Sequence, residues 1–196
     1  ILRLQPRPPG AAAGKWSAYH KEEWALRRAA EIVPVAAVPD PSVGYISLPQ
    51  PIAAEPQAFA FMIQRRLKAF PATEGLEGAQ RGVFLGELGK IARAIQAIPC
   101  LGFGPDFDAE RARFSCSSWS EFLDCEIERQ NLPRLVQRRL LTPRVCAAAY
   151  ERLQSLKQLA FASALAHRDF ITNWSNILLD ARGGIRAVLD WEFAFA

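Results

Sequence analysis

The last thirty residues of the chain, His167–Ala196, have the sequence HRDFITNWSNILLDARGGIRAVLDWEFAFA. They contain two short apolar runs, NILLD at residues 176–180 and IRAVLD at residues 185–190. Between the runs, the residues ARGG are typical of a tight turn. We therefore expect the chain to end in a β-hairpin packed on the rest of the molecule.

Polar residues lie at the ends of both expected strands. Asp169 precedes the first strand, Asn176 opens it, and Asp190 follows the second, so a hairpin brings all three to one edge. An aspartate can orient and deprotonate an attacking hydroxyl, while an amide oxygen and a second carboxylate suit Mg²⁺. The grouping of Asp169, Asn176 and Asp190 therefore suits phosphoryl transfer. The plainer alternative is a structural hairpin in which the asparagine caps a turn.

Composition favours a folded globular protein. Of the 196 residues, 50% are hydrophobic and 22% are charged, which argues against a disordered chain. No apolar run approaches the length needed to cross a bilayer, so we expect no membrane partner. The cysteines are widely spaced, without a Cys-x-x-Cys pair, and argue for reduced thiols in a cytoplasmic protein rather than a zinc site: Cys100, Cys116, Cys125 and Cys146.

The net charge of +4 comes entirely from the N-terminal third. Residues 1–70 hold nine Lys or Arg against five Asp or Glu, whereas residues 71–196 hold fifteen of each. No run of Lys and Arg with interleaved aromatic residues is present, so only the charge favours nucleic-acid binding and we do not expect that partner. A basic patch equally suits a polyphosphate.

The N-terminal part has the pattern of a small β-rich lobe with one helix. ILRL at residues 1–4 and AFAFMI at residues 58–63 are strand-like, and residues 16–32 have helical spacing, with Ser17 a candidate N-cap and Pro34 ending the helix. Arg3, on the first of these strands, is a candidate cation for holding phosphates.

The part after Lys68 is mainly helical. Apolar residues alternate at steps of four and three along a core helix over residues 82–98, GFGPDFD at 102–108 suggests a loop, and Pro133 is expected to close a helix begun by the capping pair Ser118 and Glu121. Thr142 and Pro143 predict the start of another helix in the stretch 141–166. The chain is therefore expected to be an α+β protein with lobes at 1–67 and 68–196.

The closing motifs, HRDFITNWSNILLD and VLDWEFA, resemble signatures of the aminoglycoside phosphotransferase and choline kinase-like family, which has a two-lobed protein kinase-like fold. The resemblance extends upstream. ILRL is similar to the strand that carries the phosphate-binding cation, HKEEWALRRAAEIVPV to the helix whose glutamate pairs with it, and FAFMIQRRL to the strand that enters the adenine-binding hinge. LGELGKIARAIQAI and GFGPDFD are similar to the start of the larger lobe.

The resemblance implies a role for each matching position. Asp169 is the catalytic base, and Asn176 and Asp190 are the Mg²⁺ ligands. Arg3 and Glu22 form the ion pair that clamps phosphate, and Met62 and Ile63 offer backbone groups to adenine. His167 supports the catalytic loop; Glu192 either supports the metal-binding strand or caps a turn. The implied cofactors are ATP and Mg²⁺, and the implied partner is a small-molecule hydroxyl acceptor of the aminoglycoside, choline or sugar-like class.

Three departures from the family pattern define the alternatives. The family places its asparagine five residues after the catalytic aspartate, whereas Asn173 lies four and Asn176 seven residues after Asp169. We favour Asn176, because NILLD continues from it as a strand, which makes FITNWS a two-residue expansion. Arginine replaces the usual lysine at position 3.

The third departure concerns the two ends of the chain. A glycine-containing hairpin expected before Ile1 and acceptor-binding helices expected after Ala196 are not in the sequence, which suggests truncation at both ends. The alternatives to an active enzyme are a catalytically inactive nucleotide-binding or scaffold protein and a fragment of a longer kinase.

Overall fold

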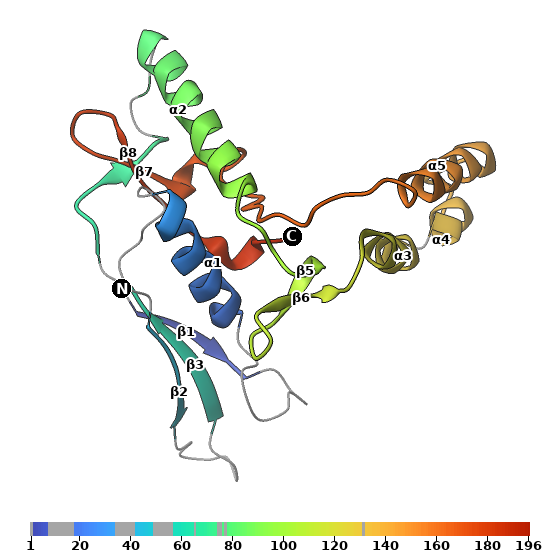
Figure 1. Cartoon of the computed structure of the whole chain (residues 1–196), viewed down its shortest axis with the longest axis horizontal. Helices are drawn as coiled ribbons and strands as arrows, with labels where there is room; N and C mark the ends of the chain where they lie inside the picture. Colours follow the sequence, from blue (N-terminus) through green and yellow to red (C-terminus); the bar gives the residue numbers. More distant parts are fainter. Residues whose placement is uncertain are drawn as a thin grey trace.

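The computed structural model describes residues 2–7, 18–33, 42–48, 57–64, 66–73, 76, 78–130 and 132–196. It has an N-terminal sheet with one helix and a larger helical part that ends in a β-hairpin (Figure 1). The elements, in chain order, are β1 Leu2–Pro6, α1 Tyr19–Ile32, β2 Ser42–Leu48, β3 Gln57–Ile63, β4 Phe70–Pro71, α2 Gly78–Gln96, β5 Phe103–Asp108, β6 Arg113–Cys116, α3 Trp119–Gln130, α4 Leu132–Gln137, α5 Pro143–Leu156, η2 Trp174–Asn176, β7 Ile177–Leu179, β8 Ile185–Val188 and η3 Trp191–Phe193.

The N-terminal sheet is antiparallel and has the order β1-β3-β2. Both predicted strands are therefore confirmed, and the later one is the centre of the sheet. The predicted helix is α1, which ends at Ile32; Ser17 and Pro34, expected to bound it, lie outside the described residues. In the register, Arg3 pairs with Met62, which fixes the position of Arg3 relative to the central strand.

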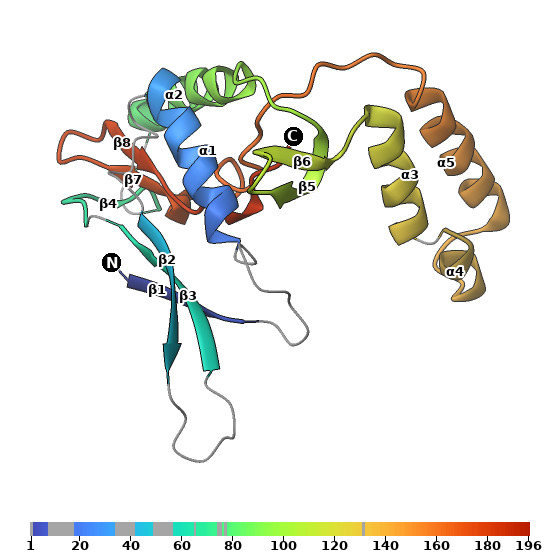
Figure 2. The ribbon, with the colours of Figure 1, turned by 60° about the horizontal axis from the view of Figure 1, so that its bottom comes forward.

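Helix α1 joins the sheet to the larger part of the molecule (Figure 2). Its apolar face, Ala25, Leu26 and Ala29, is buried in the main core together with residues of α2 and the C-terminal hairpin. Trp24 packs against Phe107 of β5, with ring centroids 4.9 Å apart. Residues on the first turn of α1 therefore lie where the N-terminal sheet meets the larger helical part.

The core of the larger part confirms the predicted four-three spacing. The five spaced residues are buried along α2 and the turn that follows it: Phe84, Leu88, Ile91, Ile95 and Ile98. The predicted C-terminal hairpin is β7–β8, and β7 also pairs with β4. Buried residues of both β7 and β8 pack into the same core as α2. This packing fixes both strands of the hairpin against the helix.

The prediction of a loop at residues 102–108 was wrong, because Phe103–Asp108 forms β5 and pairs with β6. Glycine and proline in GFGPDFD lowered its strand propensity, but tertiary pairing overrides that propensity. Gly102, at φ +81°, allows the entry into this hairpin, since a Cβ there would lie 2.4 Å from the carbonyl oxygen of Phe114.

Helices α3, α4 and α5 form a group that extends away from the body (Figures 1 and 2). The predicted N-cap is confirmed, because Thr142 Oγ1 accepts a 3.3 Å hydrogen bond from the Val145 N–H. Ser118 likewise accepts from the Glu121 N–H at 3.1 Å, although the Glu121 carboxylate bonds to Ser117 rather than back to Ser118. Pro133 does not close a helix: it lies in the first turn of α4, where a missing N–H costs no hydrogen bond.

All four cysteines are free thiols. Within the described part of the chain, no helix is long and apolar enough to cross a membrane.

Candidate active site

Asp169 and Asn176 are in direct contact. Asn176 Nδ2 donates a 2.9 Å hydrogen bond to Asp169 Oδ2. Two weaker donors approach the same carboxylate: Asn173 Nδ2 lies 3.4 Å from Oδ2 and Thr172 Oγ1 lies 3.5 Å from Oδ1. The predicted base is thus oriented by the residue predicted to be a metal ligand.

The loop between these two residues forms two successive turns. The Asn173 N–H donates to the Asp169 carbonyl at 3.0 Å, which closes one helical turn, and the Asn176 N–H donates to the Asn173 carbonyl at 3.1 Å within η2. The two additional residues are accommodated in these turns, so the separation of seven positions in sequence does not separate Asp169 from Asn176.

His167 connects this loop to the end of β8. Its Nε2 donates a 2.8 Å hydrogen bond to the Leu189 carbonyl, while Nδ1 lies 3.4 Å from the Asp169 N–H and accepts from it. The imidazole is buried and packs edge-on against Phe170 and Trp191. Burial lowers the pKa of His167 below its ordinary value of 6.5, although the Leu189 carbonyl and nearby carboxylates oppose the shift. A neutral ring with one donor and one acceptor fits both hydrogen bonds.

Asp190 lies beside Asn176 because of strand pairing. The Leu189 N–H donates a 2.7 Å hydrogen bond to the Asn176 carbonyl, and Asp190 is the next residue. Its backbone is left-handed, with φ 64°, a conformation that asparagine and aspartate adopt more readily than most residues. The Asp190 Oδ1 atom is buried and accepts no hydrogen bond; its nearest described cation is Arg3, whose Nη2 lies 3.7 Å away.

Arg3 and Glu22 form the predicted ion pair. Arg3 Nη1 lies 2.7 Å and 2.8 Å from the two carboxylate oxygens of Glu22. Glu22 is fully buried on the first turn of α1, and Gln64 Nε2 approaches it at 3.5 Å. Burial raises the pKa of Glu22, and Arg3 opposes this shift. The Arg3 guanidinium also lies 5.2 Å from the centre of the Tyr19 ring.

Arg3 contacts three carboxylates. Arg3 Nη2 lies 3.4 Å from Glu192 Oε2, in addition to its contacts with Glu22 and Asp190. Burial lowers the pKa of Arg3, but these carboxylates together raise it above its ordinary value. Lys21, the neighbour of Glu22 in sequence, also interacts electrostatically with Glu22 and Glu192, so Arg3 is one of two described cations close to these carboxylates.

The residues present fit Mg²⁺ in part. The orphaned Asp190 Oδ1 and the Asn176 amide are hard oxygen donors of the kind that Mg²⁺ prefers, and Mg²⁺ is commonly held by one or two protein ligands together with phosphates and water. Across the described ranges, no three or more His, Cys, Asp or Glu side chains gather as a metal cluster.

Met62 and Ile63 lie at the end of β3, between β1 and β2. The Met62 side chain is buried and that of Ile63 is 49% exposed. Both residues have partners on either side of β3: Met62 lies opposite Arg3 and Val43, and Ile63 lies opposite Leu2 and Ser42. A base would therefore reach unpaired backbone only beyond Ile63, where this pairing ends.

The residue-by-residue prediction missed two members of the site. Tyr19 and Gln64 contact Arg3 and Glu22, and neither belongs to a motif, so only the packing of α1 against the sheet reveals them. Glu192, left open between two roles, contacts Arg3. Its position two residues after Asp190 is the signal that places it at the same edge.

Comparison with known proteins bears on the fold and the family. No curated protein sequence matches the chain. The solved structure of aminoglycoside phosphotransferase APH(4)-Ia is similar, with 22% identity and a TM-score of 0.57 over 100% of this chain and 68% of that one. A thermostable mutant of that protein, in a ternary complex with AMP-PNP and hygromycin B, gives 22% identity and a TM-score of 0.57 over 98% and 67%.

These similarities confirm the predicted α+β, protein kinase-like fold. The sequence profile of the phosphotransferase enzyme family matches residues 2–196, nearly the whole length. The chain belongs to the phosphotransferase enzyme family.

Proposed function

We propose that the chain transfers the γ-phosphate of ATP to a hydroxyl of a small molecule. The observation that carries this proposal is the meeting of Asp169, Asn176 and Asp190 at one edge of the hairpin, with the Arg3–Glu22 pair beside Asp190. A structural hairpin would not need a buried carboxylate oxygen without a hydrogen-bond donor.

Asp169 would orient the acceptor hydroxyl and take its proton as the bond to phosphorus forms. The hydrogen bond from Asn176 restricts rotation of the carboxylate, and His167 fixes the backbone on which it stands. Since phosphoryl transfer depends mostly on positioning and charge stabilisation, this rigidity is the main contribution of the loop.

Arg3 would hold the nucleotide phosphates, and Glu22 would keep the guanidinium in place. Asn176 and Asp190 would hold Mg²⁺, which neutralises charge on the phosphates when bound. Adenine would contact the backbone just beyond β3, because Met62 and Ile63, the residues predicted for this contact, are paired with both β1 and β2. In this assignment residues 1–67 form the nucleotide-binding lobe and residues 68–196 carry the catalytic and metal-binding groups.

Family membership and a structural neighbour solved in complex with hygromycin B support this choice of acceptor class. Hydroxylated amines, including aminoglycosides and choline, are therefore the first acceptors to test, followed by neutral sugars. The second candidate function, nucleotide binding without turnover, becomes an outcome of the same experiment.

The test measures ADP release from ATP with each acceptor, in the intact chain, in Asp169→Asn and in Asp124→Asn. Asp124 is an exposed aspartate that pairs with Lys157 on the outlying helices, so its variant controls for the loss of a carboxylate. Acceptor-dependent turnover that Asp169→Asn abolishes and Asp124→Asn retains supports the proposal. Mg²⁺-ATP binding without turnover on any acceptor would favour the silent alternative.

A further inference from the structure

The orientation of the Arg3 guanidinium is not fixed by Glu22 alone. Both carboxylate oxygens of Glu22 bond to the same nitrogen, Nη1, at 2.7 Å and 2.8 Å. Two parallel bonds from two nitrogens would fix the guanidinium plane, whereas bonds that converge on one nitrogen leave the plane free to turn about it. The position of Nη2 therefore needs another restraint.

The carboxylates on the other side of Arg3 are too distant to supply this restraint. Nη2 lies 3.4 Å from Glu192 Oε2 and 3.7 Å from Asp190 Oδ1, beyond the usual range of about 2.7–3.2 Å for an N–H···O hydrogen bond. The Glu192 side chain is also 37% exposed, so water weakens its attraction for Arg3. Neither contact holds the guanidinium plane in one orientation.

Tyr19 provides a rigid surface for the guanidinium. The guanidinium carbon of Arg3 lies 5.2 Å from the centre of the Tyr19 ring, and Arg3 also donates a hydrogen bond to the phenol oxygen. Tyr19 is buried with Ala60 and Met62 of the central strand β3, and Met62 is paired with Arg3 in the sheet. Movement of the ring away from Arg3 would therefore disturb the packing of the sheet.

The two partners of Arg3 lie on one face of α1. Tyr19 and Glu22 are three residues apart on the helix, a spacing that places side chains side by side. Glu22 bonds to the edge of the guanidinium, and Tyr19 lies against its face. Arginine suits both contacts, whereas the lysine ammonium is a compact charge without a flat face.

We propose that Tyr19 is a positioning residue that fixes the plane of the Arg3 guanidinium and makes position 3 specific for arginine. The inference rests on the proposed function in one respect, because a fixed Nη2 is useful to the reaction only if Arg3 holds nucleotide phosphates beside Asp190. The contact between Tyr19 and Arg3 can itself be tested without nucleotide, so the two proposals can fail separately.

Urea unfolding tests the contact in the intact chain, in Arg3→Lys, in Tyr19→Leu and in the double variant. Lysine keeps a positive charge beside Glu22, so the cycle isolates the contact of the guanidinium with the ring. We expect Arg3→Lys to raise the unfolding equilibrium constant at least about threefold more in the intact chain than in the Tyr19→Leu background. Equal effects in the two backgrounds would overturn the proposal.

Calorimetry with Mg²⁺-ATP and with adenosine tests the consequence for phosphate binding. Tyr19→Leu should weaken ATP binding about fivefold or more and leave adenosine binding unchanged, because only ATP carries phosphates for Arg3 to hold. Tyr150, an exposed tyrosine on α5, gives the matched control Tyr150→Leu, which should bind both probes as the intact chain does. Equal weakening of ATP and adenosine binding in Tyr19→Leu would mean that Tyr19 only supports the sheet.

Two further variants keep part of the arrangement. Tyr19→Phe retains the ring and should bind ATP within about threefold of the intact chain; a loss as large as in Tyr19→Leu would assign the effect to the hydroxyl and overturn the role of the ring. Arg3→Lys leaves Tyr19 in place and should weaken ATP binding about fivefold or more. Unchanged ATP affinity in Arg3→Lys would overturn the specificity for arginine, even if Tyr19→Leu does not fold.

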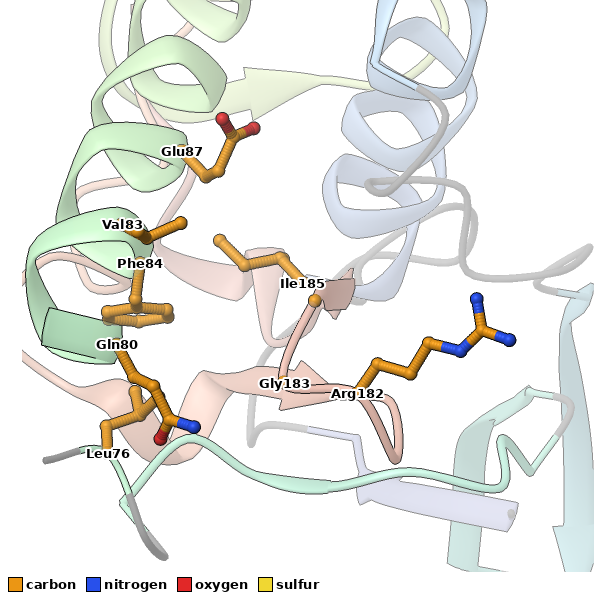
Figure 3. Close-up of a pocket in the computed structure, with 9 residues that line it drawn as sticks. Leu76, Gln80, Val83, Phe84, Glu87, Arg182, Gly183 and Ile185 are labelled. Carbon is orange, nitrogen blue, oxygen red and sulfur yellow. The ribbon is translucent and has the colours of Figure 1, made fainter.

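A cavity elsewhere in the molecule provides a control for the place of binding. It has a volume of about 280 Å³, and Figure 3 shows Val83 and Phe84 of α2 on one side of it and Ile185 of the hairpin across from them. Neither Arg3 nor Tyr19 lines it. Val83→Trp would fill this cavity and should leave ATP affinity unchanged; lost ATP binding in that variant would place the nucleotide away from Arg3.

The outcomes separate this inference from the proposed function. An intact chain that binds neither ATP nor adenosine but shows the coupling between Arg3 and Tyr19 in urea would overturn the proposed function and support the pairing of these residues. ATP binding and turnover without that coupling would support the proposed function and overturn the role of Tyr19.

Discussion

Asn176 donates a 2.9 Å hydrogen bond from Nδ2 to Oδ2 of Asp169, across a loop of six intervening residues. The same asparagine accepts the Leu189 N–H through its backbone carbonyl at 2.7 Å. One residue therefore orients the proposed base and fixes the end of the strand that precedes Asp190.

Replacing the two loop asparagines one at a time should separate their roles. Asn173 already uses its amide oxygen to accept from the Ser175 N–H at 3.3 Å, whereas Asn176 is buried at the hairpin edge. Asn176→Ala should lower kcat about a hundredfold, because a base misplaced by about 1 Å loses about that factor. Asn173→Ala should lower kcat less than about tenfold, since it loses the longer bond to Asp169 and the bonds to Ser175 but leaves the Asn176 bond to Asp169 in place.

The measurement is initial rate against Mg²⁺ concentration for both variants. Asn176→Ala should also require more Mg²⁺ for half-maximal rate, and Asn173→Ala should not. The reverse order of effects would assign the metal to Asn173.

Removing the Asp190 charge should uncouple nucleotide binding from Mg²⁺. Asp190→Asn keeps a residue type that tolerates the left-handed backbone, so the change isolates the carboxylate. Bound nucleotide stabilises a protein by about 2.7 kcal/mol at a hundredfold excess over Kd. We expect most of the Mg²⁺-dependent part of that stabilisation to vanish in Asp190→Asn.

A thermal shift with ATP, with and without Mg²⁺, gives the comparison, and Asp124→Asn is the surface control. An Asp190→Asn protein that keeps the full Mg²⁺-dependent shift would remove Asp190 from the metal site.

Breaking the Arg3–Glu22 pair should destabilise the fold in a pH-dependent way. Arg3→Met leaves Glu22 buried without its cation, and breaking a buried pair costs about 3 kcal/mol. Burial already raises the pKa of Glu22 above its ordinary value of 4.5, and loss of Arg3 raises it further. Above pH 4.5 the unfolded chain releases the Glu22 proton, whereas the folded variant retains it. The loss of unfolding free energy in Arg3→Met is therefore largest near pH 8 and becomes smaller toward pH 5.

Urea unfolding at pH 5, 6.5 and 8 measures this deficit, and Arg3→Met/Glu22→Gln completes the cycle. The double variant should recover much of the stability at pH 8, because no ionisable group remains buried there. A deficit independent of pH, with no recovery in the double variant, would mean that Arg3 stabilises through packing on Tyr19 instead.

His167 should make the protein less stable in mild acid. Burial lowers the pKa of its folded state below 6.5, so the unfolded state binds more protons as pH falls below 6.5. Stability should therefore be fully present above about pH 7 and decline from there toward the lower folded pKa. His167→Gln should be less stable at pH 7.5 but show a flatter profile between pH 7 and 5.5.

The chain has one other histidine, His20, and His20→Gln is the matched control. Unfolding free energies at closely spaced pH values provide the slope. If His20→Gln flattens the profile and His167→Gln does not, the acid sensitivity belongs to α1.

Elements with a regular spacing of apolar residues could be predicted from the sequence. Elements that depend on contacts with residues distant in the sequence were harder to predict. The apolar spacing along α2 and the apolar runs of β7 and β8 each correspond to a buried face, so the local sequence is enough to predict these elements. GFGPDFD has no such period, and it is a strand only because β6 pairs with it. A helix cap could be predicted where the capping side chain bonds to a backbone N–H three residues away, as Thr142 does.

The residues of the candidate site also differ in how far they could be predicted from the local sequence. Asp169, Asn176 and Asp190 could be grouped because one hairpin joins their strands. The Arg3–Glu22 pair, in contrast, bridges a strand and a helix through tertiary packing, so only resemblance to a family connected the two residues. The fold of FITNWS depends on main-chain hydrogen bonds at Asp169 and Asn173, which leave no periodic trace in the side chains.

The left-handed backbone of Asp190 has a consequence for how this protein can change. Glycine is the residue best suited to φ 64°, so Asp190→Gly would relieve both backbone strain and an unsatisfied buried oxygen. The same exchange would delete a proposed metal ligand. A library selected only for heat resistance should therefore enrich glycine at position 190, whereas one selected for catalysis should retain aspartate, so the two selections would drive this position in opposite directions.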